Sequence, residues 1–113
     1  MYISKIYMEI PDFQTIEGFD WDKGNIDKNW NKHKVLPGET EEIFFNEPIL
    51  VIYDSSHSLT EKRFIALGIS NSSRKLLTVF TIRKNKIRII SVRDMSKKER
   101  AVYENYKKEN SKI

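Results

Sequence analysis

Two β-rich segments joined by a short turn most constrain what this chain can fold into. The first covers residues 76–82 (LLTVFTI) and the second residues 87–92 (IRIISV), with Lys-Asn-Lys at 84–86 between them. Residues with branched or aromatic side chains fit a pleated, half-buried surface. The two segments therefore predict a central antiparallel hairpin around which the core is built.

Three arginines stand within or at the ends of these strands, at Arg83, Arg88 and Arg93. A guanidinium stays charged and offers a planar fork of donors, so on a rigid strand it suits a phosphate group. The plainer alternative is that each arginine only faces solvent, as most charged residues do. The residues by themselves leave both readings open.

The chain has 113 residues, no cysteine and only two histidines, His33 and His57. This length predicts one domain. We assign that domain to residues 19–113, and we expect residues 1–18 to be an extension that forms an edge strand or an arm. No disulfide, metal site or other cofactor is expected. No apolar run approaches the length of a membrane span and no signal-peptide pattern opens the chain, so a cytoplasmic protein is expected.

Charge is distributed unevenly along the chain. Residues 1–60 hold 5 Lys and Arg against 11 Asp and Glu, whereas residues 83–113 hold 11 against 4. A basic final third predicts a polyanion or an acidic partner. A solvated, lysine-rich tail would give the same count.

Two short helices are expected before the strands. Asp22 is placed to cap the first, and Ile26, Trp30 and His33 share a face that is expected to turn inward. Trp30, like Trp21, is expected in the core and not as a platform for nucleic-acid bases.

The second helix is expected to begin at Pro37 and to run on to Asn46. A third helix is expected after the hairpin, because Ser96 and Glu99 form a capping box. Residues 49–53 and 61–69 are expected as further strands. The predicted class is α+β, with two short N-terminal helices, a roughly four-stranded antiparallel sheet and a C-terminal helix.

Short motifs follow one another between residues 19 and 103: FDWD at 19–22 with Asn29 and KH at 32–33, FFNEP at 44–48, EKR at 61–63 with LG at 67–68, TIR at 81–83, IRIISVR at 87–93, and KERAVY at 98–103. In this order and spacing they resemble the BrnT family of bacterial type II toxins, in the RelE-like ribonuclease superfamily. The sequence departs from the family pattern at Asn25, Val92 and Met95, and its hairpin loop is short. Residues 1–18 have no counterpart in the family pattern.

The resemblance implies an endoribonuclease that arrests growth by cutting RNA. A BrnA-like ribbon-helix-helix antitoxin would neutralise it, and operator DNA would be bound only through the complex with the antitoxin. A competing interpretation is a non-catalytic module of the same fold that binds the antitoxin or nucleic acid. A metal-dependent nuclease is disfavoured because no Asp/Glu/His cluster with ligand spacing lies near the basic strands.

Metal-independent cleavage by the 2′-OH needs a base, cations for the charge on the phosphorane, and an acid. If the turn at 71–73 pairs Arg63 with Thr81, then Glu61 faces Arg83 on the same side of the sheet. A shift of one residue would put Glu61 and Arg63 on the opposite face from Arg83. We adopt the first register, which gathers the residues that match the family.

This register predicts a catalytic group of Glu61, Arg63 and Arg83, joined by His57 from the preceding loop. Glu61 is either the base or the partner that orients an arginine. His57 is either a proton shuttle near neutral pH or an exposed loop residue.

Three further basic residues are predicted to bind RNA, namely Lys86, Arg88 and Arg93. Arg93 lies about 20 Å from the hairpin turn by the rise of a strand. It therefore either binds a neighbouring phosphate or caps the sheet against the last helix.

Overall fold

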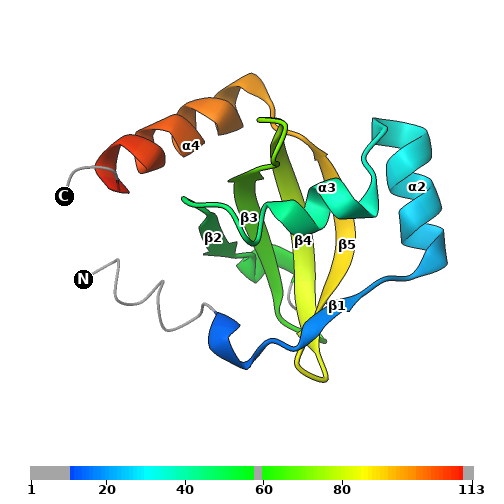
Figure 1. The fold of residues 1–113 in the computed structure, drawn as a ribbon. Helices are drawn as coiled ribbons and strands as arrows, with labels where there is room; N and C mark the ends of the chain where they lie inside the picture. Colours follow the sequence, from blue (N-terminus) through cyan, green and yellow to red (C-terminus); the bar gives the residue numbers. More distant parts are fainter. Residues whose placement is uncertain (1–10, 58–59, 111–113) are drawn as a thin grey trace.

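In the computed structural model, which describes residues 11–57 and 60–110, a five-stranded sheet carries helices on both faces (Figure 1). The strands lie in the order β1-β5-β4-β3-β2. The elements along the chain are η1 (Phe13–Thr15), β1 (Gly18–Asp20), α2 (Lys23–His33), α3 (Pro37–Glu42), β2 (Leu50–Tyr53), η2 (Ser55–His57), β3 (Arg63–Ile69), β4 (Lys75–Arg83), β5 (Lys86–Asp94) and α4 (Lys97–Asn110). The predicted α+β class is confirmed.

The sheet has one strand more than predicted, and that strand is parallel. β2 to β5 form an antiparallel meander, whereas β1 pairs with β5 in parallel, Gly18 beside Lys86 and Asp20 beside Arg88. β1 has only three residues, too few for an alternating pattern to reveal it. Residues 1–10 of the predicted extension lie outside the described residues.

The hairpin of β4 and β5 turns on two residues. Lys84 and Asn85 have φ values of 53° and 63°, the left-handed conformation that a tight hairpin turn requires at both central positions. Farther along, Val79 pairs with Ser91 but Phe80 pairs with Ile89, so β5 carries one extra residue. Such a bulge bends the strand and changes which side chains face the core beyond it.

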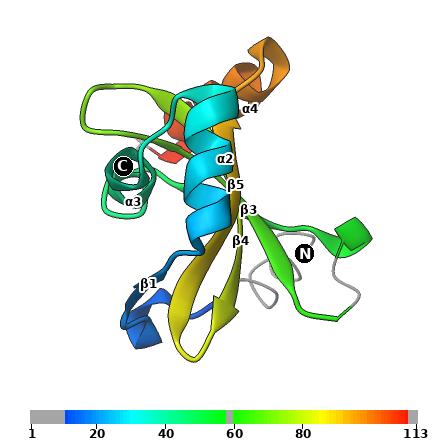
Figure 2. The same ribbon diagram turned by 90° about the vertical axis from the view of Figure 1, so that its right-hand side faces the viewer.

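Each face of the sheet has its own apolar core. On the first face, strand residues such as Phe64, Phe80 and Ile89 pack with Val35 and Ile43 from the helical segment. On the second face, α4 packs on one half of the sheet through a cluster of Leu67, Leu77, Met95 and Tyr103. In Figure 2, α2 lies in front of β5, and α3 lies to its left. The Tyr103 hydroxyl also donates to the Pro48 carbonyl at 2.7 Å, which ties α4 to the start of β2.

Helix α2 packs through a different residue than predicted. Trp30 is 43% exposed, with the Lys34 ammonium 5.1 Å from its ring centroid, whereas the buried residue is Asn29. The expectation that Trp30 turns inward was therefore wrong. The spacing of the apolar residues predicted which face of α2 turns inward. However, α2 lies against the edge of a strand, where the backbone groups need polar partners.

Two asparagines of α2 supply those partners along β5 beyond the short β1. The Asn25 amide donates to the Ile89 carbonyl at 3.3 Å, and the Asn29 carbonyl oxygen accepts from the Val92 N–H at 3.2 Å. An uncovered strand edge exposes unpaired backbone groups to other chains. Asn25 and Asn29 lie one helical turn apart, so together they bond to one carbonyl and one N–H group of that edge.

Helix α3 is shorter than predicted. It ends at Glu42, and the N–H groups of residues 43–45 bond to the carbonyls three positions earlier, in the tighter 3₁₀ pattern, instead of continuing to Asn46. This turn presses Ile43 against β3, where a Cβ on Gly68 would lie 2.9 Å from the Ile43 Cβ. Gly68 is therefore required for the close approach of this segment to the sheet.

We expect Gly68→Ala to lower the free energy of unfolding by about 1–3 kcal/mol, because the added methyl overpacks the contact with Ile43. Urea unfolding followed by circular dichroism measures the effect. Gly38→Ala is the matched control, since nothing lies within 4 Å of a Cβ there. Equal stability of the two variants would contradict the close packing.

Candidate functional site

Three residues that pair across neighbouring strands form a row on the second face of the sheet, in the half that α4 does not cover. Arg63 pairs with Thr81, and Thr81 pairs with Arg88. Side chains of paired residues lie on the same face. Arg83 and Lys86, paired with each other one row nearer the hairpin turn, share that face. We call these five residues, with Glu61, the arginine face.

Glu61 and Arg83 form the ion pair that the chosen register predicts. One Arg83 guanidinium nitrogen donates to both carboxylate oxygens of Glu61, at 3.0 and 3.3 Å. The side chains are 45% and 37% exposed for Arg83 and Glu61 respectively. An ion pair this exposed contributes little to stability, so both groups remain available to a ligand. Glu61 itself lies just before β3, which begins at Arg63 and not at residue 61 as predicted.

Thr81 holds the short segment that carries Glu61 and Arg63. It is buried, and its hydroxyl donates to the Lys62 carbonyl at 2.7 Å. The bond fixes the chain between the two candidate residues against β4. The sequence placed Thr81 opposite Arg63 but gave no sign of this hydrogen bond.

The segment between β2 and β3 brings the remaining catalytic candidates to the same end of the sheet. The Arg63 carbonyl accepts from the Asp54 N–H at 2.9 Å, and the Arg63 side chain is half-buried. His57 closes the η2 turn, and its side chain lies outside the part of the chain that the structure describes.

Arg88 is held by two aspartates near the start of the fold. Its guanidinium contacts Asp20 at 3.0 Å and Asp22 at 3.4 Å. Because Asp20 lies in β1 and Asp22 caps α2 through the Gly24 N–H, Arg88 fastens the edge strand and the first helix to the sheet. Only 23% of the Arg88 side chain is exposed, which restricts its contact with RNA.

Arg93 lies at the other end of β5 and pairs with Glu99 of α4. Two guanidinium nitrogens donate to the two Glu99 oxygens at 2.8 and 2.9 Å. Arg93 is opposite Leu77 and Arg83 opposite Lys86, so the two arginines are about 20 Å apart along β4. Of the two roles considered for Arg93, capping the sheet against the last helix is the one that these contacts support.

Arg74 is a structural residue that the sequence analysis missed. Its guanidinium binds Asp94 at 2.7 Å and Glu39 at 3.3 Å, and it donates to the carbonyls of His33 and Lys34. The bonds to Asp94 lower the pKa of that carboxyl and raise the pKa of Arg74. The partners are 20 to 41 residues away in the chain, so no local pattern could reveal them.

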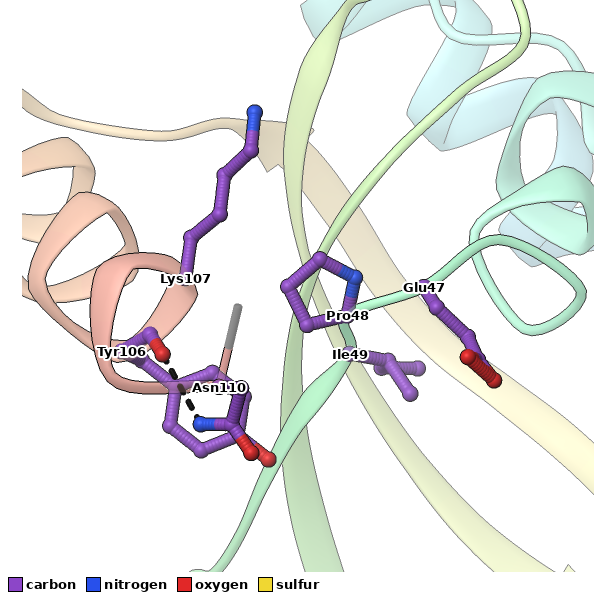
Figure 3. A pocket seen from close by; sticks show the side chains of 6 residues that line it. All are labelled: Glu47, Pro48, Ile49, Tyr106, Lys107 and Asn110. Atoms are coloured by element: carbon purple, nitrogen blue, oxygen red, sulfur yellow. Dashed lines mark hydrogen bonds between the residues drawn. The ribbon is translucent and has the colours of Figure 1, made fainter. Parts of the chain in front are cut away.

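Two hollows lie outside the arginine face. A groove of about 560 Å³ runs between α4 and the segment before β2, lined by Glu47, Pro48, Ile49, Tyr106, Lys107 and Asn110 (Figure 3). A smaller hollow of about 260 Å³ lies beside β1 and is walled mainly by phenylalanines. Neither contains the residues of the predicted catalytic group.

Within residues 11–57 and 60–110, no three His, Asp or Glu side chains come together as a metal-binding group. No helix in these same ranges is long and apolar enough to span a bilayer.

Comparison with known proteins identifies the family of this chain. The model of the BrnT family, described as the ribonuclease toxin BrnT of type II toxin–antitoxin systems, matches residues 21–99. This chain belongs to that family. It is thus a ribonuclease toxin of a type II toxin–antitoxin system by family.

The fold has a relative among solved structures. The 1.1 Å crystal structure of the Brucella abortus ribonuclease toxin BrnT is similar, with a TM-score of 0.55 and 19% identity, over 71% of this chain and 97% of that one. At this identity the likeness concerns the fold alone. No curated protein sequence matches the chain.

Three of the positions where this BrnT-family sequence departs from the family pattern have a structural role. Asn25 bonds to the backbone of β5, and Val92 and Met95 are buried on opposite faces of the sheet. None of the three contacts the Glu61–Arg83 pair. These three departures therefore leave each arginine of the arginine face in place.

The ion pair of Arg93 and Glu99 makes the free energy of unfolding depend on pH in the acidic range. Hydrogen bonds from Arg93, and from the Ser96 N–H of the predicted capping box, lower the pKa of Glu99 to about 2. Because this pKa is lower in the folded state, the stabilisation is complete above the ordinary carboxyl range and is lost as the pH falls toward 2.

We expect the wild type to lose roughly 1 kcal/mol more unfolding free energy than Glu99→Gln between about pH 6 and about pH 3, after allowance for solvent screening. Urea unfolding at the two pH values measures the difference. Asp27→Asn, in an exposed pair with Lys23, is the control that should keep the wild-type pH dependence. A Glu99→Gln profile parallel to that of the wild type would refute this role of the pair.

Proposed function

We propose that this chain is an endoribonuclease that needs no metal and cuts RNA on the arginine face. The observation that supports the proposal is the common face of Arg63, Arg83 and Arg88 with the Glu61–Arg83 ion pair at its margin. Guanidinium groups on paired strands are held at fixed spacing, as stabilisation of a charged phosphorane requires. Membership of the family of ribonuclease toxins supports the same activity.

In this proposal a phosphate of the RNA replaces the Glu61 carboxylate on Arg83, since both are oxyanions that suit the same fork of donors. Arg63 binds the same phosphate from the neighbouring strand. The displaced Glu61 then lies beside the 2′-OH and takes its proton.

The chemistry that follows is a transfer within the RNA. The 2′-oxygen attacks the phosphorus while the bond to the 5′-oxygen breaks, which gives a 2′,3′-cyclic phosphate and a free 5′-hydroxyl. His57, at the end of the η2 turn, donates the proton that the 5′-oxygen takes up.

The other basic residues of the prediction extend the RNA-binding surface. Lys86 is exposed at the hairpin turn, whereas Arg88 and Arg93 are engaged with carboxylates. We expect Lys86 to contribute most, and Arg88 and Arg93 to contribute little while they hold their carboxylate partners.

The test is gel analysis of total RNA incubated with the purified protein in EDTA. We expect the wild type to cleave, and Arg63→Ala/Arg83→Ala to be slower by at least about 100-fold, because two groups that stabilise the transition state are gone. Lys32→Ala/Lys98→Ala, at two exposed positions on helices, is the charge-matched control and should cleave normally.

Cleavage at the wild-type rate by the arginine double variant would place the chemistry elsewhere. Cleavage that appears only when Mg²⁺ replaces EDTA would refute metal independence. RNA that stays intact with the wild type, both free and on translating ribosomes, would leave a non-catalytic binding module.

We further propose that a BrnA-like ribbon-helix-helix antitoxin neutralises the toxin in the cytoplasm and that operator DNA is bound only through their complex. The type II toxin–antitoxin family supports an antitoxin partner. We expect the protein encoded by the neighbouring gene to relieve growth arrest on co-expression. Arg63→Ala/Arg83→Ala should no longer arrest growth but should still co-purify with the antitoxin, and loss of both properties would contradict a purely catalytic role for the two arginines.

A further inference from the structure

The aromatic hollow beside β1 is a feature that the proposed nuclease site does not use. Phe13, Phe19, Phe44 and Phe45 wall it, with Glu17 and Gly18 among the other residues of its rim. Its volume of about 260 Å³ falls just below the roughly 300 Å³ at which pockets for drug-sized ligands begin. We call it the aromatic pocket, and it has room for a single ring system.

The inner wall of the pocket is rigid and its outer wall is exposed. Phe44 contacts the core residue Phe80 edge-on, with ring centroids 5.2 Å apart, and Phe19 contacts Phe44 at 5.6 Å. Phe45 lies 6.2 Å from Phe19 and is 78% exposed. Phe13, which is 36% exposed, lines the same pocket, and a contiguous exposed apolar patch marks an interaction surface.

The pocket lies next to the basic turn of the hairpin. The Glu17 N–H donates to the Asn85 carbonyl at 2.7 Å, and Gly18 pairs with Lys86. The side chains of Lys84 and Lys86 are exposed. Figure 1 shows η1 and β1 beside this end of the β4–β5 hairpin. Aromatic walls next to lysines indicate a ligand that is both flat and anionic.

The pocket and the proposed catalytic site lie at the same end of the sheet but on opposite faces, the pocket against Phe80 on the first face and Arg83 on the second. Gly18 pairs with Lys86, and Lys86 pairs with Arg83. Two strand spacings separate Gly18 from Arg83, about 10 Å. One RNA strand bound at Arg83 would therefore reach the pocket by passing around the hairpin turn at residues 84–85, from the second face to the first.

We propose that the aromatic pocket is a subsite for one unpaired nucleobase of the RNA strand that is bound at Arg83. Unpaired bases in RNA complexes commonly stack on aromatic side chains while nearby cations neutralise the backbone. The Glu17 carboxylate at the rim accepts hydrogen bonds from the base edge. It favours guanine, which presents a ring N–H and an amino group side by side. This inference rests on the proposed ribonuclease activity.

The test uses fluorescence anisotropy with short, single-stranded, fully 2′-O-methylated RNA, which cannot be cut. We expect Phe45→Ala to weaken binding by about 5- to 150-fold, the range that corresponds to the loss of one base stack. Because Phe45 is exposed, its truncation leaves no cavity in the core. Val102→Ala, at an exposed apolar position on α4, is the matched control and should bind as the wild type does.

Abasic sites identify the base in the pocket. We expect one abasic position to weaken binding to the wild type, with no further loss in Phe45→Ala. Guanine at that position should bind better than uracil, and Glu17→Gln should reduce the preference.

Three outcomes would overturn the inference. If Phe45→Ala binds and cuts RNA normally while Arg83→Ala does not, the nuclease remains and the pocket is not its subsite. If Phe45→Ala cuts normally but escapes the antitoxin in cells, the pocket is a protein-docking surface. If the wild type neither binds nor cuts RNA, the nuclease and its subsite are refuted together.

Discussion

The pairing of β4 with β5 is the constraint on which the rest of the structure depends. Its two-residue turn fixes the register, and the register sets Thr81 beside Arg88 and Arg83 beside Lys86. β3 then joins β4 on one side and β1 joins β5 on the other. Because side chains alternate between the faces of a strand, a slip of one residue would exchange the arginine face with the apolar core.

The arginines of this toxin divide into two groups by the partners they have. Arg74 and Arg93 make several charge-assisted bonds each, and they join helices to the far end of the sheet. Arg83 has one exposed carboxylate partner at the opposite end. Replacing a carboxylate by a phosphate costs little at an exposed pair, whereas breaking a network of several bonds leaves charges unpaired. The same residue type therefore holds helices at the far end of the sheet, whereas at the hairpin end Arg88 also serves the fold and Arg83 is available for a ligand.

The sequence predicted the features that depend on nearby residues. The capping box of Ser96 and Glu99 and the hairpin follow from local spacing. The register that sets Arg63 opposite Thr81 was one of two that the sequence allowed, and it was chosen because it gathers the residues that match the family. The Glu61–Arg83 pair follows from that register. The features that could not be predicted join segments far apart in the chain, because no local pattern encodes which distant carboxylate an arginine such as Arg88 will meet.

Trp30 illustrates the same limit for packing. Hydrophobic periodicity assumes that a helix lies on an apolar face, so it turns the indole inward. Here the helix lies on a strand edge, where the amide of Asn29 satisfies a backbone N–H. What decides the orientation is the hydrogen-bonding need of a strand more than sixty positions later in the chain.

The parallel pairing of β1 with β5 has a consequence for the order of synthesis. Residues 18–20 leave the ribosome long before residues 86–88, to which they pair. The meander from β2 to β5 closes through contacts near in sequence, whereas β1 and α2 gain their places only once β5 exists. Contacts across such a separation form late, because closing a long loop costs entropy before any pairing compensates for it. A nascent chain therefore holds its acidic first segment unattached until its basic strands emerge, and the sheet is complete only once β5 has been synthesised.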